Sequence, residues 1–385
     1  MKKIFLTTIT LLSIASASVF GMYGVDTDWI NFLTHGNQFR ARLDQLGFTL
    51  GNDTIKGTFG FDNNMNYGGA YGGLLNDIDG THYNFVPSIS MGLGYTSSLI
   101  SVGVGYNATI GGRTQKFNGK TEPKTVNKSA HTPVLVLNAM DNAFRMAIPI
   151  QVYVNNDKFE GGGYSNEMAV SVDSQFRYYT GLDALPQVRL YLRYGLYQNE
   201  SKSTKDAEKV KTKYGESFGF DFRLYFGSMV EEVALQPLVR LAYDGALGNY
   251  HKNTRIQAVK AMNDDYATVS YGGGVWNLTL MTGLGLTANS DIVSLYLEPQ
   301  LGLQVTRSGS SSSAGVGPDG QPTAASIARD AFGLAYNVYA EIYITPLKNL
   351  EWYFEAQLGS DLPVGGSLGF GFNGTTGITW YLPAL

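Results

Sequence analysis

The chain has 385 residues, a formal net charge of −4 and no cysteine. The lack of cysteine excludes disulfides, zinc–thiolate sites and cysteine nucleophiles. Glycine (47), tyrosine (25) and phenylalanine (20) are abundant, yet the mean hydropathy is close to zero, at −0.09. This combination suits a transmembrane β-barrel, in which lipid-facing and lumen-facing residues alternate and cancel in the mean.

The first 21 residues have the pattern of a secretory signal peptide. Lys2 and Lys3 precede an apolar run over residues 4–14, and small residues follow at 15–18. A basic start, a short apolar region and a small-residue cleavage site define such a signal. The apolar run is shorter than the roughly 20 residues of a membrane-spanning helix. Cleavage after Ala17 or after Gly21 fits the pattern, so the signal extends at most over residues 1–21.

Residues 22–50 are predicted to form an N-terminal segment, partly helical, in the lumen or the periplasm. Three apolar residues share one helical face between Asn37, an N-cap candidate, and Gly47, a C-cap candidate. We therefore expect a helix over about residues 26–46. The candidate plug residues are the apolar side chains of this segment: Trp29, Phe32, Phe39, Leu43 and Leu46.

Apolar and polar residues alternate along most of residues 51–385. Examples are residues 100–110 and 218–226. The runs last roughly 9–15 residues, which suits tilted membrane strands of about 9–11 residues. Strands of soluble sandwiches are shorter, at about 5–6 residues. The pattern predicts an all-β, antiparallel, up-and-down transmembrane barrel over residues 51–385.

The connections between these runs alternate between short turns and long polar loops. Short periplasmic turns and long extracellular loops are typical of outer-membrane barrels. The short turns are expected near residues 96–98, 141–142, 182–186, 227–230, 288–291 and 346–349. Counting back from a periplasmic C-terminus makes Ile55–Phe61 the first strand and gives about 14 strands, within a range of 12–16. If residues 39–50 form a strand instead, the count rises to about 16, with a further strand before it.

The polar faces of the predicted strands carry charged residues, which must pair or meet water. The lumen-facing candidates are Glu167, Asp173, Arg177, Arg189, Arg193, Asp221, Arg223, Arg240, Glu298, Glu341, Glu351 and Glu355. The basic residues lie on sequence-adjacent strands and most of the acidic residues on later ones. One interpretation is a transverse field that orients small polar solutes in an aqueous passage. The other is a set of ion-pair ladders that only brace the wall.

No enzymatic chemistry is predicted. The four histidines, His35, His82, His131 and His251, are expected in loops or the N-terminal segment, and none has metal-ligand spacing. An outer-membrane hydrolase would need a His–Ser pair on the outer wall, which this assignment does not provide. Residues 365–369 match G-x-S-x-G, but a strand follows rather than the helix that this motif requires. We expect no catalytic residue, metal or cofactor.

The block from Met22-Tyr23-Gly24-Val25-Asp26 through Trp29-Ile30-Asn31-Phe32-Leu33-Thr34-His35-Gly36-Asn37-Gln38-Phe39-Arg40-Ala41-Arg42 resembles the variable surface proteins of intestinal spirochaetes (Brachyspira). Residues 44–48 and 55–61 continue the similarity, which covers about the first sixth of the chain. The resemblance implies a major outer-membrane surface antigen with variable exposed loops, often in oligomeric complexes, and no enzymatic activity.

The leading hypothesis is therefore a surface-exposed barrel of the bacterial outer membrane whose loops act as a host-facing antigen. The alternative is a diffusion porin, or a channel for hydrophobic compounds with the N-terminal segment as a hatch. An outer-membrane hydrolase is the third. The expected partners are outer-membrane lipid, related surface proteins in homo- or hetero-oligomers, and host antibodies or host surfaces at the long loops; nucleic acid is not expected.

Overall fold

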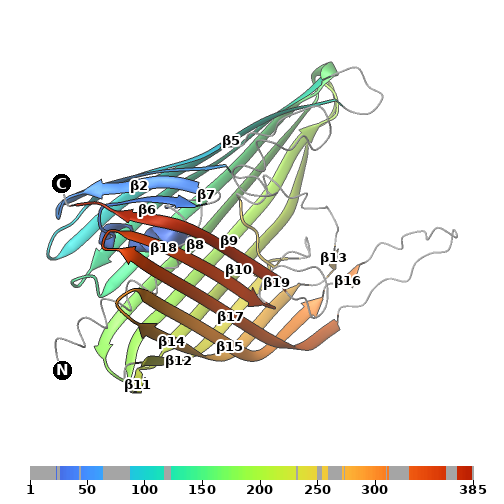
Figure 1. Ribbon diagram of the computed structural model, residues 1–385. Helices are drawn as coiled ribbons and strands as arrows, with labels where there is room; N and C mark the ends of the chain where they lie inside the picture. Colours follow the sequence, from blue (N-terminus) through green and yellow to red (C-terminus); the bar gives the residue numbers. More distant parts are fainter. Residues whose placement is uncertain are drawn as a thin grey trace.

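The computed structural model describes residues 23, 27–42, 45–63, 87–116, 123–230, 233–248, 254–258, 271–272, 274–308, 310–311, 329–360 and 371–383. Within these ranges the chain is almost entirely β-strand (Figure 1). Sixteen tilted strands close into one antiparallel barrel. No helix in the described part of the chain is long and apolar enough to cross a bilayer.

The barrel strands follow one another in chain order around the wall. Their bounds are β1 Gln38–Arg42, β2 Gln45–Gly51, β3 Ile55–Asn63, β4 Pro87–Tyr95, β5 Ile100–Lys116, β6 Pro123–Ala139, β7 Phe144–Lys158, β8 Tyr164–Leu182, β9 Leu185–Lys202, β10 Val210–Tyr225, β12 Val233–Ala246, β14 Trp276–Asn289, β15 Val293–Ser308, β17 Arg329–Leu347, β18 Leu350–Gly359 and β19 Gly371–Tyr381. The minor elements are η1 Thr27–Thr34, η2 Glu160–Gly162, β11 Ser228–Val230, β13 Tyr271–Gly272 and β16 Ser310–Ser311.

Strand β1 closes the barrel. It pairs with β2 on one side and with the last strand, β19, on the other, where Phe39 lies opposite Trp380. Asn37 secures this seam, because its side-chain amide donates to the carbonyls of Gly51 and Pro383 at 2.9 and 2.8 Å. The closure leaves the wall without a free edge, which a sheet in lipid requires.

Five of the six predicted short turns are confirmed, whereas residues 228–230 of the sixth form β11 within the β10–β12 connection. These six connections lie at the end of the barrel that also holds Asn37 and Pro383. They join β4 to β5, β6 to β7, β8 to β9, β10 to β12, β14 to β15 and β17 to β18. The β6–β7 turn is tight: Met140, Asp141 and Asn142 all adopt positive φ, between 55° and 63°. At the other end of the barrel β5 to β10, with 15 to 19 residues each, extend furthest (Figure 1).

The predicted count of about 14 strands is slightly too low, and sixteen is the upper end of the predicted range and the number given by the alternative in which residues 39–50 form a strand. The predicted helix over residues 26–46 is not what the structure shows. The barrel begins at Gln38 rather than near residue 51, so Ile55–Asn63 is its third strand and the count is sixteen. Among the described residues of this range, the helical part is Thr27–Thr34, a 3-10 helix. Strand β1 has five residues, which are too few to show alternation. The apparent helical spacing of the apolar residues arises because they belong to two short consecutive strands, β1 and β2.

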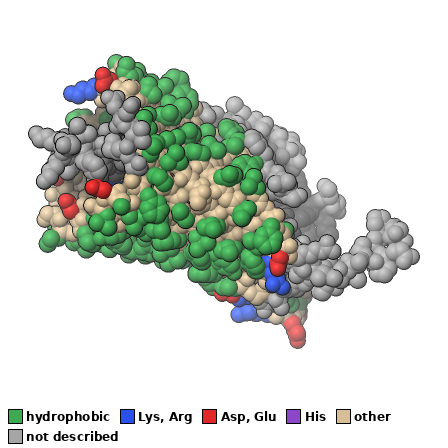
Figure 2. Space-filling view, turned by 90° about the horizontal axis from the view of Figure 1, so that it is seen from below, with side chains coloured by type: hydrophobic (Ala, Val, Ile, Leu, Met, Phe, Trp, Pro, Cys, Tyr) green, Lys and Arg blue, Asp and Glu red, His purple; other side chains and the backbone are tan. Residues whose placement is uncertain are grey.

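The prediction that Phe39 and Leu46 belong to the plug is therefore wrong. Their side chains are 37% and 43% exposed and lie on the outward face with the other apolar residues. Leu43 lies outside the described residues. Large apolar side chains such as Leu93, Leu303 and Trp380 cover the outer wall, and Figure 2 shows this apolar surface with charged side chains gathered near its ends. The wall thus presents hydrocarbon to lipid and polar groups to the lumen.

The assignment of β1 predicts opposite environments for neighbouring residues. Because the chain has no cysteine, Phe39→Cys and Arg40→Cys each provide a single labelling site. A fluorophore at residue 39 should be quenched several-fold more by lipids with brominated chains than one at residue 40, whose side chain is buried on the lumen side. Equal quenching at both positions would contradict the strand.

Candidate functional site

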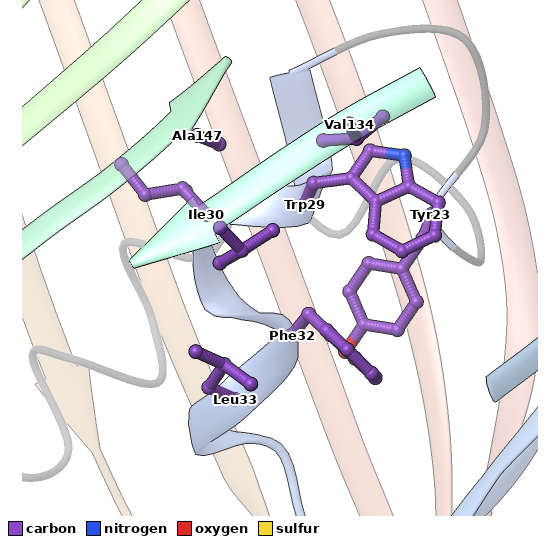
Figure 3. Packing of buried hydrophobic residues seen from close by; sticks show 8 residues of the cluster. Tyr23, Trp29, Ile30, Phe32, Leu33, Val134 and Ala147 are labelled. Carbon is purple, nitrogen blue, oxygen red and sulfur yellow. The ribbon is translucent and has the colours of Figure 1, made fainter. Parts of the chain in front are cut away.

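The lumen contains an N-terminal plug, here defined as Tyr23 and residues 27–35. Helix η1 packs on the inner surface of β5, β6, β7 and β8. Trp29, Ile30 and Phe32 have no exposed surface, and Leu33 is 3% exposed. Figure 3 shows the ring of Tyr23 beside Trp29 and Phe32, with centroid separations of 5.1 Å to each. Burial of each large apolar side chain contributes about 1.5–3 kcal/mol, so η1 is held chiefly by this cluster.

Four glycines make room for the plug on the wall. Gly92 pairs with Gly105 and Gly94 with Gly103 across β4 and β5. A Cβ on Gly105 would lie 2.4 Å from the ring of Trp29, and one on Gly94 would lie 2.4 Å from Leu33 Cδ2. The Gly-x-Gly-Tyr repeats of these strands therefore form a face without side chains, which we call the glycine face. It lets the plug approach the backbone directly.

Polar side chains of the wall satisfy the exposed groups of η1. Arg145 Nη1 donates to Asn31 Oδ1 at 3.1 Å. Lys56 Nζ donates to the carbonyl of Leu33 at 3.1 Å and also to that of His35. The last carbonyls of a helix lack partners within it, so Lys56 serves as the cap for η1.

His35 is the last residue of the plug and is hydrogen-bonded within it. Its Nδ1 is hydrogen-bonded to the hydroxyl of Tyr23, and its backbone N–H donates to the carbonyl of Asn31 at 3.1 Å. Burial, together with nearby cations that include Arg40 and Lys56, holds the pKa of His35 well below its ordinary value. The neutral imidazole can therefore lie among cations without repulsion.

A second segment, residues 254–258, enters the lumen from the connection between β12 and β14. The backbone N–H of Ile256 donates to Ser217 Oγ at 2.9 Å, and that of Ala258 donates to Ser171 Oγ at 2.8 Å. Arg255 forms an ion pair with Asp173. The apolar contacts of the segment are with Ala130, Tyr153, Ala169 and Tyr197. The inner wall of β6 to β10 is therefore covered at two separate places.

Asp221 on β10 is the centre of the lumen charge network. It has no exposed surface and lies 2.8 Å from Arg223 Nη2, 3.0 Å from Arg240 Nη2 and 3.8 Å from Arg193 Nη2. Arg193 in turn lies 3.1 Å from Asp244. A buried carboxylate with several cationic partners is stable only as a set, because each isolated charge would be costly to bury.

Five arginines form a row across five adjacent strands. The register places Arg145 opposite Arg177, Arg177 opposite Arg189, Arg189 opposite Arg223, and Arg223 opposite Arg240. Like charges directly opposite one another weaken a sheet. Cation–π contacts offset part of this cost: Arg145 lies over Tyr179, Arg189 over Tyr225 and Arg223 over Tyr191, at 5.1, 4.6 and 5.1 Å.

An acidic wall with tyrosine partners lies on β15, β17 and β18. Glu341 and Glu355 are directly opposite in register and both are buried. The Tyr339 hydroxyl lies between the two carboxyl groups, within hydrogen-bond reach of both, and Tyr343 donates to Glu341 at 2.9 Å. Tyr296 donates to Glu298 in the same way. The lumen thus carries positive charge on one arc of the wall and acidic groups on another.

Comparison with protein families leads to the same class of protein as the barrel geometry. The model of the family described as Serpulina hyodysenteriae variable surface protein matches residues 2–381. The chain belongs to this family. No curated protein matches it. The closed barrel and the family together make this variable surface protein an outer-membrane β-barrel protein.

Several solved outer-membrane structures are similar in part. They are the translocator domain of the autotransporter NalP from Neisseria meningitidis (13% identity, TM-score 0.31, 74% of this chain and 90% of that one), CdiB from Acinetobacter baumannii (11%, 0.36, 90% and 60%) and the siderophore receptor PirA from Pseudomonas aeruginosa (9%, 0.38, 89% and 79%). These similarities are too distant to bear on the function.

The structure places all twelve sequence-predicted charged residues on barrel strands. Most belong to the three groups above; Glu167 accepts from Tyr153 and Asn155 at 3.2 and 3.1 Å, and Glu351 accepts from Tyr381 at 3.1 Å. Of the candidate plug residues, Trp29 and Phe32 lie in the lumen. The sequence analysis missed Arg145, Asp244 and Arg255. Arg145 lies in an alternating run with apolar Met146 and Ile148, and this pattern indicates a lumen-facing position for Arg145. Among the described residues, no group of three or more His, Asp or Glu could hold a metal ion.

Loss of the central carboxylate should destabilise the barrel. Asp221→Asn would leave three arginines without their shared partner, and breaking a buried ion pair costs about 3–5 kcal/mol. The measurement is the free energy of unfolding in urea with lipid vesicles. Asp206→Asn, at an exposed position, is the matched control and should change it by less than about 0.5 kcal/mol. Equal effects of the two variants would contradict a network centred on Asp221.

Proposed function

We propose that this variable surface protein displays its long-loop end at the cell surface, as a host-facing antigen, on a barrel whose lumen is closed in the resting state. The burial of Trp29 against the glycine face is the observation that carries this proposal. It supports a barrel that is filled near its short-turn end rather than open. The function then lies in the long-loop end, which is presented to host antibodies or host surfaces. The protein would act as a monomer or in oligomers with related proteins, and the function requires no cofactor.

The direction of the barrel follows from the same proposal. The short-turn end faces the periplasm and the extended ends of β5 to β10 face outward. The mature chain would begin near residue 18 or 22, after removal of the signal peptide, so the plug would lie close to the new N-terminus. A segment so near a chain end can leave the lumen without breaking any strand, since its only covalent connection to the wall is through residues 35–37, which lead into β1.

A second candidate is a channel for small polar solutes that opens when the plug leaves. The segregation of charge supports it: the arginine row spans β7 to β12, and the acidic residues lie on β15 to β18. Opposed charges across a water-filled passage would orient dipolar solutes. A hydrophobic-compound channel has less support, because the apolar side chains of the lumen are occupied in packing the plug.

The decisive experiment is planar-bilayer conductance of the refolded chain from Met22, compared with a chain that lacks residues 22–36. This deletion removes the plug but retains Asn37 and β1. Gly105→Leu should displace the plug without a deletion, and Gly57→Ala is the matched control, since its Cβ would have no neighbour closer than 3.8 Å.

We expect silence from the chain that begins at Met22 and from Gly57→Ala. Stable ohmic steps after deletion or in Gly105→Leu would make the gated channel the primary function. Silence in every variant, with folding shown by resistance to unfolding in SDS without heating, would favour surface display alone. Steps in the unaltered chain would contradict the closed lumen.

A further inference from the structure

The outer wall carries a Ser–His–Tyr arrangement that the sequence analysis did not anticipate. His131 was expected in a loop, but it lies within β6. Its Nδ1 is 2.6 Å from the hydroxyl of Tyr106 on β5, and its Nε2 is 3.1 Å from Ser129 Oγ. Ser129 and His131 are two residues apart on one strand, so both side chains lie on the same face. That face also carries Leu135, 44% exposed, and is therefore the lipid-facing one.

We propose that Ser129, His131 and Tyr106 form a catalytic site on the outside of the barrel that hydrolyses the acyl esters of membrane lipids. A serine hydroxyl becomes a useful nucleophile when a base within hydrogen-bond reach accepts its proton and a third group orients that base. All three parts are present with the required connectivity. Tyr106 is the orienting group, since the proton of His131 Nδ1 can be donated to its oxygen while Nε2 accepts from Ser129.

The reaction can be written with every atom accounted for. Ser129 Oγ bonds to the ester carbonyl carbon as its proton passes to His131 Nε2. Collapse of the tetrahedral adduct breaks the bond to the alcohol, which leaves with that proton, and the acyl group stays on Ser129. Water then attacks the acyl-enzyme with His131 again as base, and the fatty acid departs as the serine regains its proton. The co-reactants are the lipid ester and water.

The surroundings suit a substrate with an acyl chain. In the strand register Ser129 lies opposite Ile110 on β5 and Val154 on β7, and His131 lies opposite Ala108 and Val152. The neighbours of the Ser–His pair on both sides are therefore apolar. An acyl chain alongside the wall would lie against these residues with its ester next to the serine.

The depth of Ser129 in the membrane also suits hydrolysis of lipid esters. Ser129 lies ten residues along β6 from Ala139 at the short-turn end. At about 3.3 Å per residue and a tilt of about 40°, this is roughly 25 Å, the height of the apolar band of such barrels. The residues of this face are apolar from Ala139 to Pro133, and the next two, His131 and Ser129, are polar. The site is thus at the boundary where lipid esters meet water, on the side of the long connections.

The structural alternative is that the three groups only satisfy one another at the membrane boundary. The test is release of fatty acid from phosphatidylcholine in mixed micelles by the refolded chain, with labelling by a fluorophosphonate located by mass spectrometry. The chain has no cysteine to compete for the reagent. We expect Ser129 to be labelled, Ser129→Ala to lose both signals, and His131→Gln to reduce release by about 10²–10⁴-fold, the usual contribution of a general base.

Tyr106→Phe retains the ring but not the hydroxyl, so it should reduce the rate and alter its pH profile. Ser165→Ala, on β8, is the control and should behave as the unaltered chain. No release and no labelling from a barrel shown to be folded would overturn the proposal, as would release that persists in Ser129→Ala. Because the site is outside the barrel, these results are independent of whether the lumen conducts.

Discussion

The contact between Trp29 and a stretch of wall without side chains is the interaction on which the interior of this barrel depends. About eight strands already enclose a space that side chains can fill, so sixteen leave a lumen wide enough for water or for a folded segment. The paired glycines of β4 and β5 allow η1 to lie directly on the backbone, with the Trp29 ring where side chains would otherwise stand. Lys56 and Arg145 then satisfy its polar groups, so a short 3-10 helix is held without any strand pairing.

The charges of the lumen follow from the same geometry. Every second residue of a barrel strand faces inward, and register places charges of neighbouring strands directly opposite one another. The arginine row is stabilised by ion pairs with Asp221 and by cation–π contacts with tyrosine rings. The acidic wall is stabilised by hydrogen bonds that tyrosine hydroxyls donate to the carboxyl groups. These networks brace the wall, and with the plug displaced the same groups would line a passage. The two functional candidates therefore share one structure and differ in whether the plug leaves.

The alternation of long strands predicted the barrel, its short turns and the strands of its lumen charges, because period 2 is local information. The first two strands were predicted only as the alternative, because five- and seven-residue strands show too little alternation and the spacing of Phe39 and Leu46 is also that of a helix. The glycine face could not be assigned, since only the fold brings η1 to β4 and β5. His131 was assigned to a loop because polar residues precede the apolar part of β6, yet that boundary is where the Ser129–His131 pair lies.

The claim that the plug fills the lumen against the glycine face is tested most directly by the environment of Trp29. With Trp276, Trp352 and Trp380 replaced by Phe, Trp29 is the only tryptophan left. The fluorescence of the refolded barrel should be blue-shifted and should resist quenching both by aqueous acrylamide and by brominated lipid, because the side chain has no exposed surface. Emission typical of water with ready acrylamide quenching would show that the plug does not occupy the glycine face, and the account of a closed lumen would fail.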